Sequence, residues 1–308
     1  QKKKMITVLS LHRILDEPDF FWNPIRPDSF ERLLQYLHEH YTIICFRDIA
    51  EYLDRSSGKK PLLILSFDDG YYDFYEHALP ILLKFGVKAN HNIVNACASD
   101  NQVIWTQRLN TLFSHCMNRG KELSFSHQRE SWKLADFQGN WMNFYQHSYQ
   151  IFLRIPFTER LAMIEEKEQL YGVCTSVRMM NWEEVIHCAK HGIEIGSHTY
   201  HHDVISTIAD RNILINEIVR SKTDMESRLG IPVTVLALPN GQAHADIDEI
   251  ATLAGFSHIL YVGEKLNEME KYKGPGPVHS FRINLVEESL PEMILRTEMF
   301  HAKLKRHA

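Results

Sequence analysis

The chain has 308 residues, of which 44% are hydrophobic, so it is long enough to bury a large core in one α/β barrel or in two smaller domains. Its net charge of −5 argues against nucleic acids and anionic membranes as partners, because no basic excess is present to neutralise phosphate groups. No apolar run reaches the length of a membrane-spanning helix, and the composition gives no indication of the oligomeric state.

Short β-like segments alternate with helical patterns along most of the chain. The candidate strands are Ile6–Leu11, Thr42–Phe46, Leu62–Phe67, Lys88–Val94, Ile193–Ile195, Val233–Leu238, Ser257–Val262 and Ser280–Leu285. Asp28 is a candidate N-cap of one helix, Asn181 with Glu184 forms the capping box of another, and Gly230 ends a third. Such repeated strand–helix units predict a parallel sheet, either doubly wound or closed into a barrel.

Residues 100–178 interrupt this alternation. The stretch is rich in Trp, Gln, Asn, Ser and His, and it shows helical patterns but no convincing strand. The spacing of Trp105, Leu109 and Phe113 indicates a buried helical face. We therefore predict a single domain over residues 1–308 that carries a helical insertion at 100–178.

Two polar motifs directly follow candidate strands. They are Ser66-Phe67-Asp68-Asp69-Gly70 and Ser197-His198-Thr199-Tyr200-His201-His202. One aspartate and two histidines supply three protein ligands and leave a position open for water, as a catalytic zinc requires, and the other aspartate is left for proton transfer. Spacing alone permits His198 to act with His201 or with His202. Polar motifs at the C-terminal ends of several strands favour a barrel over a doubly wound sheet.

A third motif, Leu238-Pro239-Asn240-Gly241, follows a later strand. The order of Asp68-Asp69-Gly70, His198-Thr199-x-x-His202 and this motif resembles that of the polysaccharide deacetylase family, the NodB-homology or carbohydrate esterase family four enzymes. The resemblance extends from Leu11-His12-Arg13 to Phe281-Arg282-Ile283 and leaves only the insertion uncovered. It implies a distorted (β/α) barrel of about seven parallel strands and metal-dependent removal of acetyl groups, usually N-acetyl, from glycans.

The resemblance also implies roles for the motif residues. Asp69, His198 and His202 match the metal ligands of the family, and Asp68 matches the general base that deprotonates the attacking water. His201 is then left to pack against the site or to support it. Two imidazole ligands make Mg²⁺ a poor fit, so we expect Zn²⁺, with Co²⁺, Ni²⁺ or Fe²⁺ as alternatives.

The third motif departs from the family pattern, which has an arginine two residues before the proline and a tyrosine after it. Asn240 stands at the tyrosine position and keeps the backbone N–H that contributes to the oxyanion hole. Ala237 stands at the arginine position, so another cation must orient Asp68. Arg282 is the first candidate for that cation and Arg178 is the second.

A general acid is needed to protonate the departing amine. His279, just before a late candidate strand, is the position that resembles the family's acid, and His12 at the end of the first strand is its rival. Trp182 stands in a context that resembles a family motif lining the acetyl pocket, and we expect Trp182, Pro239 and Tyr71 to contact the substrate. Core packing is the more common role of any single aromatic residue.

The polar triplet Asn90-His91-Asn92 lies within a candidate strand where family members more often have Ala-Thr-Phe-Phe. Such a triplet either faces the mouth of the active site or caps a water network.

The sequence therefore predicts a metal-dependent hydrolase of amide bonds, a carbohydrate deacetylase whose partner is an acetylated saccharide, most readily an N-acetyl amino sugar of a polysaccharide or glycan precursor. An O-acetyl esterase needs the same residues. A catalytically weak glycan-binding protein is the alternative from another class. The absent arginine argues for this alternative, and the intact Asp68 argues against it.

Five cysteines are scattered along the chain without a Cys-x-x-Cys pair. Their odd number and wide spacing indicate neither a disulfide framework nor a thiolate zinc site, so a reducing compartment is the simpler interpretation. We expect a cytoplasmic location, and export instead if a leader preceded this sequence.

Overall fold

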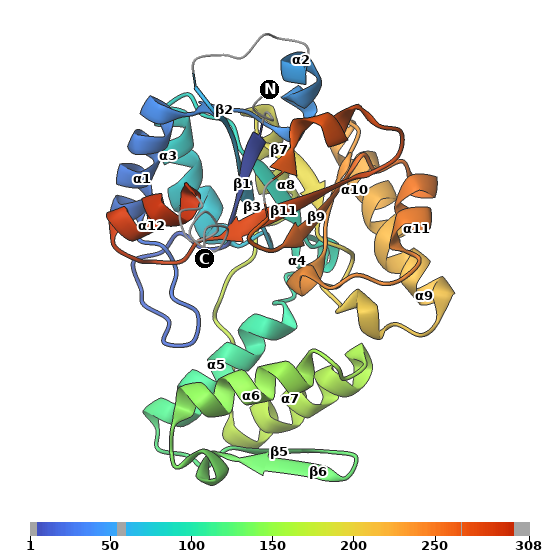
Figure 1. Ribbon diagram of the computed structural model, residues 1–308. Coiled ribbons are helices and arrows are strands. Elements are labelled where there is room, and N and C mark those ends of the chain that lie inside the picture. Colours follow the sequence, from blue (N-terminus) through green and yellow to red (C-terminus); the bar gives the residue numbers. More distant parts are fainter. Residues whose placement is uncertain (1–4, 54–59, 266, 299–308) are drawn as a thin grey trace, which may run out of the picture.

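Seven parallel strands close into a barrel at the centre of the protein (Figure 1). The computed structural model describes residues 5–53, 60–265 and 267–298. The barrel strands are β1 (Met5–Leu11), β3 (Leu62–Phe67), β4 (Asn90–Ile93), β7 (Glu194–Ser197), β8 (Val235–Ala237), β9 (His258–Val262) and β11 (Val278–Asn284). Pairing of Ile6–Leu11 with Leu62–Phe67 joins β1 to β3 and completes the ring. The predicted barrel is confirmed.

Two short strands extend the ring at its edges. β2 (Thr42–Ile43) runs parallel to the start of β3, and β10 (Asn267–Glu268) runs antiparallel to the start of β1. Each of the eight predicted strands is present, and β2 is the one that ends well before its predicted limit, because a 3₁₀ turn begins at Phe46.

Alternate residues of each barrel strand face the interior or the surrounding helices, as the two-residue period of a strand requires. Ile6 and Val8 of β1 pack with Ile64 of β3 in a cluster inside the barrel. Their neighbours Leu9 and Leu65 belong instead to the larger cluster that joins the strands to the outer helices. A hydrophobic layer therefore lies on both faces of the sheet.

Helices cover the outside of the barrel (Figure 1). They are α1 (Pro27–His40), α3 (Leu79–Lys84), α4 (Asn95–Asp100), α8 (Trp182–Lys190), α9 (Arg211–Ile215), α10 (Ser221–Leu229), α11 (Ile247–Ala254) and α12 (Leu290–Thr297). The short helix α2 (Ile49–Leu53) lies instead at the end of the barrel where the strands begin, and its Ile49 joins the interior cluster (Figure 1). The capping box of Asn181 and Glu184 and the left-handed Gly230 are confirmed. Asp28 is not an N-cap, because Pro27 already begins the helix. No helix in the described ranges is both long and apolar enough to cross a bilayer.

Residues 105–171 form a lobe at one end of the barrel, drawn in green in Figure 1. The lobe contains α5 (Trp105–Asn118), the hairpin of β5 (Ser124–His127) and β6 (Glu130–Lys133), α6 (Trp141–Phe152) and α7 (Phe157–Tyr171). Its core includes the predicted α5 face of Trp105, Leu109 and Phe113.

The hairpin in this lobe corrects the expectation that the stretch has no strand. Only Phe125 and Trp132 of the two strands are buried, and the tight turn uses Gln128 at φ 54° where a glycine or asparagine is more usual. The usual sequence signals of a hairpin are therefore weak here.

Candidate active site

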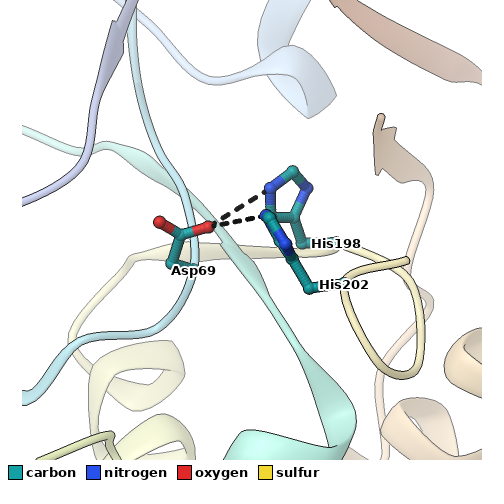
Figure 2. Close-up of side chains that lie close together, drawn as sticks. All are labelled: Asp69, His198 and His202. Carbon is teal, nitrogen blue, oxygen red and sulfur yellow. Dashed lines mark ion pairs between the residues drawn. The ribbon is translucent and has the colours of Figure 1, made fainter. Parts of the chain in front are cut away.

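The three predicted metal ligands meet at the C-terminal ends of the barrel strands (Figure 2). Asp69 Oδ1 lies 3.4 Å from His198 Nε2 and 3.3 Å from His202 Nε2. One ligand atom from each residue lies within 4.8 Å of the others, and all three side chains are buried. His201 lies outside this group and contacts Glu217 instead. The structure therefore brings His202, and not His201, together with His198.

This donor set fits a divalent cation. Asp69 Oδ1 is buried without a hydrogen-bond partner, although it faces two imidazole nitrogens. His198 Nδ1 hydrogen-bonds the carbonyl oxygen of Ala237 at 2.9 Å, which orients its Nε2 toward Asp69. Burial alone would raise the pKa of Asp69, but contacts with the two histidines outweigh burial and hold that pKa well below its ordinary value. The carboxylate is therefore ionised, as a metal ligand must be.

Four residues of the site have a backbone conformation that is unfavourable for a residue with a side chain. The seven non-glycine residues with positive φ in the described ranges include Asp69 at 76°, Thr199 at 65°, His202 at 61° and Asn240 at 56°. A side chain rarely adopts this region, and such residues persist where the surrounding structure holds them. The turn that directs both carboxylates into the site spans Asp69 and Gly70, whose φ is 88°.

Asp68 is held by two partners. Its Oδ1 accepts one hydrogen bond from Arg282 and one from the Asn92 amide, each at 2.7 Å. Arg282 reaches it from β11, whereas the alternative Arg178 pairs with Glu184 at the surface. Burial would raise the pKa of Asp68, but the Arg282 guanidinium is the strongest of the charges that together hold it below its ordinary value. The structure thus supplies a cation beside Asp68 from β11, although Ala237 stands at the position of the family arginine.

Asn92, from the polar triplet of the candidate strand, lies in the site and bonds Asp68. Asn90 and Asn92 lie in the barrel next to Ser66, whose hydroxyl donates to Asn90 at 2.8 Å and accepts from Asn92 at 3.1 Å. A Cβ atom at Gly196 would overlap Asn92 Oδ1, so only glycine leaves room for this network. His91 points outward and packs on Phe74. The alternation of polar residues in a buried strand was the available signal.

A pocket of about 280 Å³ opens above these residues. From the barrel and its loops it is lined by His12, Trp22, Asp68, Asp69, Tyr71, His198, His202, Leu238, Asn240, Val262, Arg282 and Asn284. The lobe adds Thr106, Gln107, Asn110, Tyr145, Tyr149, Gln150 and Leu153. The Tyr149 hydroxyl bonds the Asn240 side chain and so joins the lobe to the third motif. The lobe therefore forms one wall of the active-site pocket.

Residues 55–259, more than half of the chain, match the polysaccharide deacetylase family. The chain belongs to this family. The match supports carbohydrate deacetylation as the activity. No curated protein sequence gives a significant match.

Solved structures share the fold of this family member. The deacetylase PplD from Streptococcus pyogenes in complex with acetate superposes with a TM-score of 0.63 at 18% identity, covering 96% of this chain and 99% of that one. IcaB from Ammonifex degensii gives 0.62 at 17% identity, covering 96% and 97%. A de-N-acetylase from Aggregatibacter actinomycetemcomitans gives 0.57 at 16% identity, covering 95% and 100%.

The position of His279 corrects its assignment as general acid. It lies at the start of β11, whereas Arg282 of the same strand reaches the pocket, and the start of a parallel strand lies toward the opposite end of the barrel. There it bonds Asp248 at 2.7 Å and is 39% exposed. His12, its rival, lines the pocket, and burial lowers its pKa despite the nearby Asp69.

Of the three residues expected to contact the substrate, one lines the pocket and two do not. Tyr71 lines the pocket of this polysaccharide deacetylase. Trp182 does not, because it packs in the layer outside the barrel and its indole N–H donates to Ser99. Pro239 is buried, and its neighbours Leu238 and Asn240 face the pocket instead.

The lobe also braces the loop that carries the second histidine. The Trp105 indole N–H donates to the His202 carbonyl oxygen at 3.2 Å. Asp203, the next residue, pairs at 3.1 Å with Arg160 of α7, which is fully buried and stacks on Trp105. These contacts hold a residue with an unfavourable φ in place.

Proposed function

We propose that this protein hydrolyses N-acetyl groups on the amino sugars of a glycan in a metal-dependent reaction. The observation that carries the proposal is the buried group of Asp69, His198 and His202 beside the ion-paired Asp68, at the base of an open pocket. The shared fold with a de-N-acetylase supports an amide rather than an ester as substrate.

Asp69, His198 and His202 would hold the metal. Two imidazoles and one carboxylate suit Zn²⁺ or another transition metal, and a water-filled position completes such a site. When bound, the ion supplies polarisation of the acetyl carbonyl and lowers the pKa of water.

Asp68 is the base that takes the proton from the attacking water. Arg282 and Asn92 both bond its Oδ1, so Oδ2 is left to accept the proton. Water then adds to the acetyl carbon, and the backbone N–H of Asn240 donates to the developing oxyanion. Cleavage of the carbon–nitrogen bond requires a proton on the nitrogen, and His12, which lines the same pocket, is the donor in its protonated form.

Arg282 also bears on the glycan-binding alternative. The missing arginine at Ala237 was the argument for a catalytically weak protein, and the Arg282–Asp68 pair supplies the charge that was missing. The base is therefore ionised and oriented, which supports catalysis.

Release of acetate from a panel of N-acetylated and O-acetylated glycans, with metal analysis of the same preparation, tests the proposal. The double variant His198→Ala/His202→Ala should lose both metal and activity while it remains folded. Stoichiometric metal in this variant would refute the ligand assignment.

The two aspartates are distinguished by a matched pair of variants. Asp68→Asn should keep the metal and lower turnover by at least about a hundredfold, the scale expected for loss of a positioned base. Asp69→Asn should release the metal. The opposite pattern would show that the two roles are reversed.

A further inference from the structure

The turn that follows β8 is held by both the barrel and the lobe. Pro239, Asn240 and Gly241 form a 3₁₀ turn in which Asn240 has φ 56° and ψ 13°, and Gly241 has φ 66°. Gly241 lies so close to β9 that a Cβ atom there would be 2.9 Å from the backbone nitrogen of Val262. The lobe supplies the second contact, because the Tyr149 hydroxyl of α6 donates to the Asn240 side-chain oxygen. Barrel and lobe therefore both fix this turn.

The conformation of Asn240 decides where its backbone N–H points. The bond that closes the turn runs from the Gly241 N–H to the Leu238 carbonyl oxygen at 2.9 Å, so it does not use the Asn240 N–H. Because φ is the rotation between this N–H and the side chain, a side chain held at φ 56° also fixes the direction of the N–H. Asn240 lines the pocket, and the proposed reaction uses its N–H to stabilise the oxyanion.

The left-handed conformation of Asn240 needs a stabilising partner. This region is unfavourable for a residue with a Cβ atom, and asparagine tolerates it best when its side chain forms a hydrogen bond. The partner here is distant, since Tyr149 lies 91 positions away in the sequence. A hydrogen bond between protein groups contributes about as much free energy as the left-handed conformation costs. The Tyr149 hydroxyl is therefore sufficient to keep Asn240 in this conformation.

Tyr149 is itself held in place by the lobe. Its ring stacks on Trp105 with 5.6 Å between the ring centroids. Trp105 is 1% exposed, and the buried Arg160 guanidinium lies over its ring at 4.6 Å. Burial raises the pKa of Tyr149, so the hydroxyl keeps its proton and acts as the donor toward Asn240. The donor is therefore in position before a substrate arrives.

Two stacked rings of the lobe reach two loops of the site. Trp105 donates its indole N–H to the His202 carbonyl oxygen at 3.2 Å, and Tyr149 donates to Asn240. The first loop carries a predicted metal ligand, and the second carries the proposed oxyanion donor. The lobe therefore contacts both loops through one aromatic stack.

We propose that Tyr149 is a positioning residue of the hydrolytic reaction: its hydroxyl holds Asn240 in the left-handed conformation that directs the Asn240 N–H to the oxyanion. The inference rests on the proposed function and adds a requirement to it, because the barrel then needs the lobe to complete its oxyanion hole. Tyr149 acts on the transition state through Asn240 and not on the bound substrate. Loss of the hydroxyl should therefore lower kcat and leave KM close to the wild-type value.

Tyr149→Phe tests the proposal, because it removes the hydroxyl and keeps the stacked ring. We expect kcat to fall by about 10- to 100-fold, with KM changed by less than about twofold, because the N–H is misdirected rather than absent. Metal content should stay at the wild-type value. Tyr171→Phe is the matched control, since it removes a hydroxyl of the same lobe that bonds the Glu122 carbonyl and does not line the pocket.

Variants of Asn240 separate an indirect role of Tyr149 from a direct one. Glycine adopts positive φ without a side-chain partner, so Asn240→Gly should retain more activity than Asn240→Ala, which lacks both the acceptor and this freedom. In the Asn240→Gly background, Tyr149→Phe should cause no further loss of kcat, because the hydroxyl has no side chain left to hold.

Two results would overturn the inference. One is a wild-type kcat in Tyr149→Phe. The other is an equal loss from Tyr149→Phe in the wild-type and Asn240→Gly backgrounds, which would show that the hydroxyl acts on the substrate directly. If Tyr149→Phe does not fold, as judged by urea unfolding, equal kcat values of Asn240→Ala and Asn240→Gly overturn the inference in its place.

A second substrate separates this inference from the proposed function. Hydrolysis of 4-nitrophenyl acetate forms the same kind of tetrahedral oxyanion but needs no glycan. If the protein cleaves this ester and releases no acetate from glycans, the proposed function fails, and the same variants decide the role of Tyr149 on the ester. If glycans release acetate and Tyr149→Phe changes neither reaction, the inference fails and the proposed function stands. If metal-loaded wild-type protein cleaves neither substrate, both fail.

Discussion

Replacement of Arg282 by methionine should weaken both the fold and the reaction. Arg282 and Asp68 are 0% and 2% exposed, and their ion pair spans 2.7 Å. Loss of one partner from a buried pair typically costs about 3–5 kcal/mol, because the other charge remains uncompensated. Here Asn92 still bonds Asp68, and two guanidinium nitrogens of Arg282 are buried without partners, so removing them offsets part of the loss. We therefore expect about 3 kcal/mol, the lower end of this range.

Turnover of Arg282→Met should fall by about ten- to a hundredfold, less than in Asp68→Asn, because the base is misoriented rather than absent. Urea unfolding measures the stability, acetate release measures turnover, and metal content should stay at the wild-type value because Arg282 contacts none of the ligands. Arg282→Met with Ala237→Arg, which restores the family arginine, should recover part of the turnover. An unfolding free energy within about 1 kcal/mol of wild type, together with turnover within twofold, would refute this account of Arg282.

Two further variants test the contact of Trp105 with the His202 loop and the stability of the protein at acid pH. Trp105→Phe removes the indole N–H that bonds the His202 carbonyl, so metal affinity should fall by about 10- to 100-fold. Chelator competition measures this affinity, and an unchanged value would show that the bond does not position His202. Burial lowers the pKa of His258 to about 4 from 6.5, so its stabilising contribution is complete above pH 6.5 and is lost as the pH falls toward 4, by at most about 3 kcal/mol. His258→Phe should flatten urea unfolding stability across this window and the exposed control His38→Phe should not; parallel curves for wild type and His258→Phe would exclude the effect.

The barrel and the ligand group could be predicted because their signals are local. Asp68-Asp69-Gly70 and His198-Thr199-x-x-His202 each follow a strand, and parallel strands bring their C-terminal ends together. The same rule shows why His279 was misplaced. It precedes the predicted strand instead of following it, so strand direction already argued against the family-based assignment.

The rest of the site depends on contacts between distant segments. Tyr149 meets Asn240 across 91 positions, and Trp105 meets His202 across 97. No periodicity or spacing encodes such pairs, because packing of the lobe on the barrel decides them. Asn92 was closer to prediction, since a polar triplet within a candidate strand indicated either the mouth of the active site or a water network.

The place where the lobe enters the chain has a consequence for how such proteins diversify. β4 and β7 are hydrogen-bonded neighbours, from Asn90 beside Glu194 to Ile93 beside Ser197, although residues 94–193 separate them in sequence. We call this β4–β7 pairing the seam. A longer segment between the two strands adds little to the entropic cost of closing the barrel there. The lobe can therefore change in length and sequence without breaking the pairing of β4 with β7, although it forms one wall of the pocket above Asp69 and His198. The same seam is a natural junction for building chimeric enzymes.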